Sequence, residues 1–230
     1  MEFLKLREPG YALLSGVGIE IGGFEHPAVL PNARKITRCD RLLKEEAGAV
    51  FSEIDVSGLP AVDVRLDLDT DGLGHFAEAS VDFVVCCHVL EHLKNPIKAV
   101  QEIMRTLRPG GRAALAIPDK DFTFDQDRPL TAWEPLELIY REKITTPVPD
   151  DYMDIVRHVH PKMLQVGEAE RQGYLEHLLK RREHLNIWDS RTFPVFLSRS
   201  AALLDITWRS VYVAGADLSR FEYFTVLEKN

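Results

Sequence analysis

A short acidic and glycine-rich stretch near the amino terminus is the first part of this sequence with residues that could do chemistry. The stretch GIEIGGFEHP (18–27) places Glu20 inside an apolar run and follows it at once with Gly22 and Gly23. Glycines lack a Cβ, so a ligand can approach the backbone there closely, and a carboxylate accepts hydrogen bonds or pairs with a cation. Asp40 lies 20 residues after Glu20, where an acid typically accepts hydrogen bonds from a ribose diol. The pattern predicts a nucleoside cofactor.

Two nucleoside cofactors fit this stretch, and the residue types favour one of them. NAD requires the full G-x-G-x-x-G sequence, which turns a helix N-terminus toward the pyrophosphate. Here the sequence is G-x-E-x-G-G-x-E-H-P, with carboxylates where a diphosphate would lie, and the chain contains no Y-x-x-x-K of the short-chain dehydrogenases. S-adenosylmethionine carries a sulfonium and an ammonium group and no phosphate. We therefore expect S-adenosylmethionine as the cofactor, with a nicotinamide-dependent oxidoreductase as a weaker alternative.

The elements around these residues alternate as in a parallel sheet with crossover helices. Five candidate strands occupy residues 17–21, 34–39, 61–66, 81–87 and 112–117. In an open α/β sheet, ligands bind beyond the carboxyl ends of the strands. DLD (67–69) ends the third candidate strand, and CCHVLEH (86–92) continues the fourth. We therefore expect both segments at the same edge of the sheet as Glu20 and Asp40.

A helix is predicted from Asn95 to Leu107. Asn95 is a favourable N-cap and Pro96 suits the first helical position. One apolar stripe follows at Ile97, Val100, Met104 and Leu107. A second, shorter helix is expected over 41–47, and Asp40 could cap it while also binding the ribose.

The middle third of the chain has a different composition. Residues 118–161 contain six prolines, a helical stretch follows over 162–184, and strand patterns return at 203–213 and 220–229. We predict an α/β, Rossmann-like, doubly wound sheet of seven mostly parallel strands with a C-terminal antiparallel hairpin. Residues 1–230 would form a single domain, with a helical insertion after strand five, over 118–190, that shapes the acceptor site.

One long segment resembles a known family. Residues 79–119, ASVDFVVCCHVLEHLKNPIKAVQEIMRTLRPGGRAALAIPD, are similar to the second half of class I S-adenosylmethionine-dependent methyltransferases, which have His-Val-Leu-Glu-His after an apolar strand and Leu-x-Pro-Gly-Gly after the next helix. The resemblance covers roughly residues 15–125. A bacterial subgroup, often associated with sugar or glycan metabolism, also has EIG at its first motif and IPDKxFTFD, here IPDKDFTFD (117–125). The usual third glycine of the first motif is lacking here.

The resemblance assigns nine residues to the cofactor. It places Glu20, Gly22 and Gly23 beside the methionine part and Asp40 beside the ribose. It places Asp67, Leu68 and Asp69 beside the adenine, and Cys87 and His88 on the sulfonium side.

Methyl transfer to a hydroxyl also needs a base that takes the proton. Histidine, with an ordinary pKa near 6.5, suits that role at neutral pH. The candidates are His158 and His160 in HVHP and His184 in HLNIWDSRTF, with Asp119 at the tip of strand five as a rival. We therefore expect O-methylation of a small-molecule or sugar hydroxyl. Small-molecule N-methylation and a noncatalytic S-adenosylmethionine-binding partner stay open.

The sequence predicts no metal site. His88 and His92 lie four residues apart, but HVLEH places Glu91 wrongly for the zincin pattern H-E-x-x-H, and no Cys-x-x-Cys occurs. We interpret His92 as a structural residue that packs or holds a loop.

Composition limits the partners. The net charge of −8 disfavours nucleic acid, which attracts Lys and Arg, and Lys180-Arg181-Arg182 is interpreted as a solvated helix face. The three cysteines form no disulfide framework, and neither a signal peptide nor an 18-residue apolar span occurs. These features predict a cytoplasmic protein that binds a small molecule or glycan and no membrane, with the insertion as a candidate homodimer contact.

Overall fold

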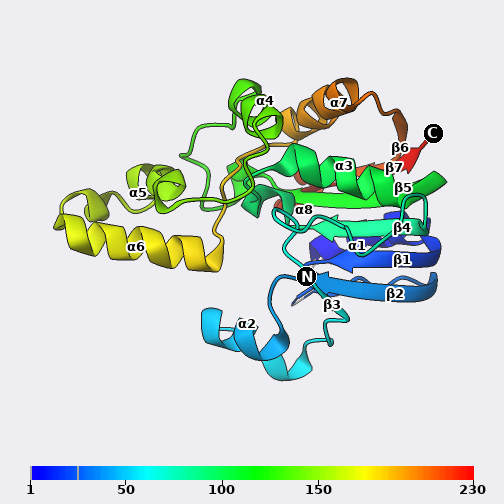
Figure 1. Cartoon of the computed structure of the whole chain (residues 1–230), viewed down its shortest axis with the longest axis horizontal. Coiled ribbons are helices and arrows are strands. Elements are labelled where there is room, and N and C mark those ends of the chain that lie inside the picture. The colour runs from blue at the N-terminus through cyan, green and yellow to red at the C-terminus, as the bar shows by residue number, and fades with distance from the viewer. Residues whose placement is uncertain (1, 25) are drawn as a thin grey trace.

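The computed structural model describes residues 2–24 and 26–230 and contains one seven-stranded sheet (Figure 1). Its strands are β1 (Ser15–Ile21), β2 (Asn32–Asp40), β3 (Val64–Arg65), β4 (Val81–Cys87), β5 (Leu107–Pro118), β6 (Trp208–Ala214) and β7 (Glu222–Lys229). The order is β3-β2-β1-β4-β5-β7-β6. β1 to β5 pair in parallel, and β7 is antiparallel to both β5 and β6. From β1 the chain adds β2 and β3 on one side, and it then crosses to add β4 and β5 on the other. Ligands of such sheets bind at this switch point between β1 and β4.

Helices cover both faces of the sheet and also extend beyond it. They are α1 (Glu2–Tyr11), α2 (Lys44–Val50), α3 (Pro96–Thr106), α4 (Trp133–Arg141), α5 (Met153–His158), α6 (Glu168–Arg181), α7 (Thr192–Leu204) and α8 (Ala216–Ser219). Short 3-10 turns are η1 (Val56–Gly58), η2 (Leu90–His92), η3 (Lys120–Phe122), η4 (Pro149–Tyr152) and η5 (Pro161–Leu164). α3, α4 and α7 pack together on one face, and α1 packs on β6 and β7. α5 and α6 project away on the side toward which β1 and β2 point (Figure 1).

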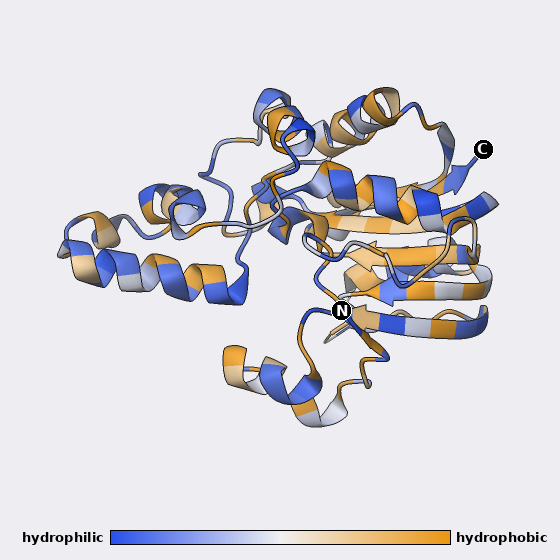
Figure 2. Ribbon diagram, in the orientation of Figure 1, coloured by the Kyte–Doolittle hydropathy of each residue, from blue (hydrophilic) through white to orange (hydrophobic). Residues whose placement is uncertain are grey.

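The core follows from the alternation of side chains along the central strands. Val84 and Cys86 of β4 face the cluster under α3, whereas Phe83 and Val85 face the opposite cluster under α1. All four are almost wholly buried, as expected for a strand covered on both faces. Figure 2 shows this apolar centre of the sheet, in contrast to the many hydrophilic residues of α6.

The insertion contains a small core of its own. Tyr152, Ile155, Val156, Leu175 and Leu178, from η4, α5 and α6, form a buried cluster separate from the two clusters of the sheet. The α5–α6 unit is therefore stabilised mainly by its own contacts.

The predicted fold class is confirmed. Four predicted strands, at 17–21, 34–39, 81–87 and 112–117, correspond to β1, β2, β4 and β5. The strand expected over 61–66 is reduced to the two residues of β3, an edge strand preceded by Pro60, which has no N–H to donate. The strand pattern at 203–213 begins only at Trp208, because its first two residues complete α7.

The helix predictions are confirmed in part. α3 begins as expected, because the Asn95 side chain accepts the N–H of Lys98 at 3.0 Å. The helix expected over 41–47 begins instead at Lys44 with Leu43 at the N-cap position, so the interpretation of Asp40 as its cap is wrong. The stretch 162–184 divides into η5 and α6, and neither α1 nor α7 was predicted. The single domain over 1–230 and the acceptor-binding role of 118–190 stay predictions.

Across residues 2–24 and 26–230, none of the helices combines the length and the apolar character needed to cross a membrane.

Candidate functional site

Two adjoining cavities open at the carboxyl edge of the sheet, where β1 and β4 separate. The first, of ≈ 300 Å³, is lined by Asp40, Asp67 and Leu68, and the second, of ≈ 620 Å³, by Glu20, Gly23 and Cys87. Both are also lined by Ile21, Gly22, Phe24, His88 and His92. Small-molecule sites typically have volumes of about 300 to 1,000 Å³. The structure thus brings eight of the nine predicted cofactor residues to these cavities; Asp69 is the exception.

The glycine pair fits the turn after β1 for steric reasons. Gly22 has φ +68°, and a Cβ there would lie 2.5 Å from Cγ2 of Val89. A Cβ on Gly23 would lie 2.6 Å from Cδ of Glu20. Only glycine therefore lets this turn pack against the segment after β4 and border both cavities.

Glu20 fastens this turn to its surroundings. It is 2% exposed; Oε1 accepts the N–H of Ala28, and Oε2 lies 3.3 Å from Nε of Arg38. Burial raises the pKa of this carboxyl. Glu20 borders the larger cavity, but its contacts are those of a residue that holds the loop, and its contact with the cofactor stays a prediction.

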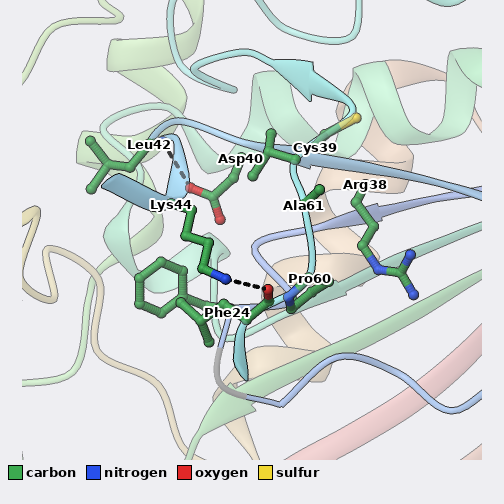
Figure 3. A pocket seen from close by; sticks show the side chains of 11 residues that line it. Phe24, Arg38, Cys39, Asp40, Leu42, Lys44, Pro60 and Ala61 are labelled. Atoms are coloured by element: carbon green, nitrogen blue, oxygen red, sulfur yellow. Dashed lines mark hydrogen bonds between the residues drawn. The ribbon is translucent and has the colours of Figure 1, made fainter. Parts of the chain in front are cut away.

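Asp40 ends β2 beside the smaller of the two cavities. One carboxylate oxygen accepts the N–H of Leu42 at 3.0 Å, and burial raises the pKa of the group. Phe24, Asp40 and Lys44 also line a third cavity of only ≈ 20 Å³ (Figure 3). That space holds about one water molecule, so a nucleoside fits only on the other side of Asp40.

The two acids after β3 differ in role. Asp69 is fully buried and accepts the backbone N–H groups of Lys94 and Asn95, each at 2.9 Å, so it fixes the start of α3. Asp67 lines the smaller cavity and pairs with Arg182 at 2.8 Å, and Arg182 also lies 3.1 Å from Asp69. The structure does not place Asp69 at either cavity.

Arg182 corrects the interpretation of the basic run at 180–182 as a solvated helix face. It ends α6 with φ 56°, and its side chain turns to the sheet edge, where it lines the smaller cavity. Its neighbour Arg181 pairs with Glu53 at 2.6 Å and lies over the ring of Phe51. The basic run at 180–182 and the acids of DLD (67–69) were the only sequence signals for this contact.

His88 is the centre of a buried charge cluster that the sequence did not reveal. Its Nε2 lies 2.6 Å from Glu222, its Nδ1 lies 3.4 Å from Glu91, and its ring stacks on Phe221. Arg7 forms a bidentate pair with Glu222 at 2.7 and 2.5 Å. Burial disfavours the imidazolium, yet the hydrogen bond to Glu222 and the negative charge of the nearby Glu91 raise the pKa of His88 to about 9, so it is charged at neutral pH.

Cys87 has an environment that keeps it unreactive. Its Sγ lies 3.6 Å from the hydroxyl of Tyr11, and burial raises the pKa of the thiol to about 11. It is therefore a neutral wall residue of the larger cavity.

None of the four predicted bases lines either of the two cavities. Asp119 is 3% exposed and accepts hydrogen bonds from the N–H and Oγ of Ser190, so it anchors a loop. His158 pairs with an aspartate on α5 itself, and His160 lies against Tyr174 of the insertion. Neither histidine lines a cavity, because both belong to the projecting α5–α6 unit.

His184 is the predicted base that contacts a residue lining both cavities. Its ring packs edge-on against His92, with 4.8 Å between centroids, and its Nδ1 lies 2.6 Å from Asp125. Asp125 also pairs with Arg128 at 2.7 Å. The last residue of IPDKDFTFD thus orients His184, a role that the sequence pattern alone did not show.

Similarity to known proteins supports the cofactor interpretation of this edge. Residues 52–115 match the family model described as a methyltransferase domain. A Mycolicibacterium smegmatis protein named as an S-adenosylmethionine-dependent methyltransferase is 34% identical over 94 residues, which are 40% of this chain and 37% of that protein. A Streptomyces fradiae protein, named as an uncharacterized 37.1 kDa protein in a transposon, is 42% identical over 64 residues, which are 27% of this chain and 18% of that protein. The chain thus spans well under half the length of these relatives.

Residues 52–115 of this chain are thus similar to a methyltransferase domain. S-adenosylmethionine is the cofactor that such a domain implies, and the acids and glycines at the two cavities fit it without a phosphate cradle. A solved complex from Haloferax volcanii, of the Trm112 methyltransferase activator with a methyltransferase, has a TM-score of 0.52 at 11% identity, with 99% of this chain and 90% of that chain covered.

The fold alone does not define the chemistry. A Rhodobacter sphaeroides structure named as a Zn-dependent alcohol dehydrogenase reaches a TM-score of 0.53 at 13% identity, with 94% of this chain and 84% of that chain covered. Rossmann-like folds support many reactions, so the cofactor assignment depends on the residues at the cavities.

Proposed function

We propose that this chain is an S-adenosylmethionine-dependent methyltransferase that methylates a hydroxyl of a small molecule or sugar. The observation that carries the proposal is the pair of adjoining cavities at the β1–β4 crevice, in a chain whose residues 52–115 match a methyltransferase domain. The resemblance to the bacterial subgroup with IPDKxFTFD supports the sugar or glycan class of acceptor.

The residues suggest how the cofactor would lie. Asp40 would accept hydrogen bonds from the ribose hydroxyls, with the adenine beside Asp67 and Leu68 in the smaller cavity. The methionine part would pass the bare backbone of Gly22 and Gly23 into the larger cavity. The sulfonium would then lie near the residues that both cavities share.

The acceptor would enter on the side of the insertion. Catalysis would come largely from alignment of the oxygen, the methyl carbon and the sulfur in one line near contact distance. His184 supports O-methylation, because it is the predicted base that contacts a residue lining both cavities and its contact with Asp125 orients the ring.

The first test is cofactor binding by isothermal titration calorimetry with S-adenosylhomocysteine. Asp40→Asn should weaken binding about 30- to 160-fold, since hydrogen bonds to a charged group contribute about 2–3 kcal/mol. Asp127→Asn, a change on an exposed residue, is the matched control and should leave the affinity unchanged. Binding of NADH without binding of S-adenosylhomocysteine would refute the proposal.

The second test identifies the acceptor atom. S-adenosylmethionine with an isotopically labelled methyl group is incubated with panels of sugars, phenols and amines, and the product is analysed by NMR. An O-linked methyl signal supports the proposal, and an N-linked one would replace it with small-molecule N-methylation. Tight cofactor binding without turnover on any panel would favour a noncatalytic binding protein.

A further inference from the structure

Three side chains with metal-ligating atoms meet where η2 contacts the loop after α6. Glu91 and His92 belong to η2, and His184 belongs to that loop. One ligand atom from each lies within 4.8 Å of the other two. The carbonyl of Glu91 also accepts the N–H groups of Leu185 and Asn186, which holds the loop against η2. The grouping is therefore fixed by main-chain contacts as well as by side chains.

Glu91 is a buried carboxylate without hydrogen-bond donors. It is 1% exposed, and among residues 2–24 and 26–230 neither of its side-chain oxygens has a hydrogen-bond partner. The nearest cation, His88, lies 3.4 Å away and is held by Glu222 through its other nitrogen. Leaving a buried acceptor unsatisfied destabilises the fold, and the cost is larger when the group is charged. A bound ion at Glu91 would remove that cost.

Both histidines are oriented for metal binding. Nδ1 of His92 lies 2.5 Å from the carbonyl oxygen of Arg182, and Nδ1 of His184 lies 2.6 Å from the carboxylate of Asp125. A carbonyl or carboxylate oxygen only accepts, so Nδ1 of each ring donates and Nε2 keeps its lone pair. Nε2 of His92 lies 3.9 Å from Glu91. Acceptors behind Nδ1 are the usual outer partners of metal-ligating histidines.

We propose that Glu91, His92 and His184 bind a divalent ion of the zinc class. Two imidazoles and one carboxylate are a known catalytic zinc ligand set, which leaves a fourth position open. Imidazole nitrogens favour zinc and its transition-metal neighbours over magnesium or calcium. Tetrahedral ligands on bonds of about 2.1 Å lie about 3.4 Å apart, so the side chains need to move together by somewhat more than 1 Å.

The sequence did not predict this site because its two histidine ligands, His92 and His184, are far apart in the chain. HVLEH offers His88 and His92 at helical spacing, but His88 is held by Glu222, and the second imidazole comes from His184, far along the chain. The i, i+4 pattern of HVLEH does not match the zincin motif, and the proposed ligand set depends on the fold.

The ion would lie at the place of methyl transfer, since His92 lines both cavities. This consequence rests on the proposed function, whereas ion binding does not. An ion there would lower the pKa of an acceptor hydroxyl. The proton would leave to water, the oxygen would bond to the methyl carbon, and the carbon–sulfur bond would break with its electron pair left on sulfur. Nε2 of His184 would then be a ligand in place of a base.

The test measures metal binding by chelator-treated protein without a histidine tag. Zn²⁺ is titrated against a chromophoric zinc indicator, and Co²⁺ binding is followed by its visible absorption. The wild type should bind one equivalent of Zn²⁺ with a dissociation constant of micromolar or below, and Mg²⁺ should not compete. His92→Gln and His184→Gln should each weaken Zn²⁺ binding at least 100-fold, and Asp125→Asn about 10- to 100-fold.

Matched controls come from the exposed face of α6. Glu176→Gln and His177→Gln make the same chemical changes on exposed residues and should bind Zn²⁺ like the wild type. Glu91→Gln keeps the side-chain size and removes the charge, so it tests the site if a histidine variant fails to fold. Wild-type affinity within threefold of the His92→Gln/His184→Gln double variant, or no wild-type binding at 100 μM Zn²⁺, would overturn the proposal.

A cross-test separates this inference from the proposed function. Asp40→Asn should show the about 30- to 160-fold weaker S-adenosylhomocysteine binding given above and keep Zn²⁺ binding. His184→Gln should lose at least 100-fold in Zn²⁺ affinity and keep S-adenosylhomocysteine binding. Zn²⁺ binding in a protein that never binds S-adenosylhomocysteine would remove the proposed function and leave the ion site. Cofactor binding without a specific ion site would do the opposite.

Discussion

The two sides of the candidate site are held in place by different interactions. On the sheet side, Gly22, Asp40 and His88 follow strands whose apolar side chains form the two main core clusters. On the insertion side, Arg182 and His184 come from a unit with a separate small core. Arg182 pairs with Asp67 at the sheet edge, and the ring of His184 packs against His92. The sheet side is thus fixed by main-chain ladders and burial, and the insertion side by a few ion pairs and by the two main-chain hydrogen bonds to the carbonyl of Glu91.

The largest effect is expected from cavities made in the two cores. Ile103→Ala, in α3 under the sheet, should lower the free energy of unfolding of the whole chain by about 4 kcal/mol, because Ile103 is 1% exposed. Leu178→Ala in the insertion core should cost about 3 kcal/mol, mostly as local opening of α5 and α6. Urea denaturation measures the first effect, and hydrogen exchange with limited proteolysis measures the second. Equal loss of protection in β4 and α6 for Leu178→Ala would show that the two sides unfold as one unit.

The buried pair between Arg7 and Glu222 should give the next largest effect and a pH dependence. Glu222→Gln leaves Arg7, 2% exposed, without its counter-charge, which should cost about 3 kcal/mol at pH 7. Burial opposes ionisation of Glu222, but the hydrogen bonds from Arg7 and His88 lower its pKa below the ordinary 4.5. A lowered folded-state pKa gives stability that is fully present above pH 4.5 and is lost as the pH falls through the folded value.

The measurement is the difference in unfolding free energy between the wild type and Glu222→Gln from pH 7 to pH 3. The difference should rise slightly as the pH falls from 7 to 5, because the variant also loses the contact that raises the pKa of His88, and it should shrink below pH 4.5. A difference that keeps growing below pH 4.5 would contradict the assigned ionisation of Glu222. Glu134→Gln, whose exposed carboxylate is paired only at 3.6 Å with Arg199, is the matched control with a flat profile.

The sequence could predict the sheet side of the site and not the insertion side. Glu20, Gly22 and Asp40 lie at strand ends, and strand ends of a parallel sheet meet at one edge whatever the loops do. His158 ends α5 and His160 precedes η5, in a unit whose direction depends on tertiary packing, so their residue type alone did not place them. Arg7 and Glu222 are far apart in the chain, and no local pattern links them.

Asp69 shows a different limit. The family resemblance places an acid at this strand end, but DLD contains two acids. The path of the backbone after β3 decides which of the two faces the ligand. In the structure Asp67 lines the cavity while Asp69 holds the start of α3. Period-two alternation suggests the same face for both residues, and the turn after β3 breaks that alternation.

Loss of the main ion pair between the two sides should have a smaller effect. Arg182→Ala leaves the fully buried Asp69 and the cavity residue Asp67 without a cation. Breaking a buried pair typically costs about 3–5 kcal/mol; we expect about 2 kcal/mol here, because Arg182 is 17% exposed. Thermal denaturation measures the stability, and S-adenosylhomocysteine affinity should fall about tenfold as the cavity wall loosens. An unchanged affinity would show that the insertion side is positioned without this contact.

The smallest effect is expected from an ion pair of the same chemical type that lies within the insertion. Arg171 pairs with Glu168 along α6, but Glu168 is 76% exposed, so water and salt screen the pair. Arg171→Ala should change the unfolding free energy by about 0.5 kcal/mol or less and leave S-adenosylhomocysteine affinity unchanged. The contrast with Arg182→Ala separates burial from charge, since both variants remove one arginine from α6 or its end. If Arg171→Ala lowered stability as much as Arg182→Ala, overall charge would hold the insertion in place. A gap of more than 1 kcal/mol that persists in 0.5 M NaCl would instead assign that role to the buried contact with Asp67 and Asp69.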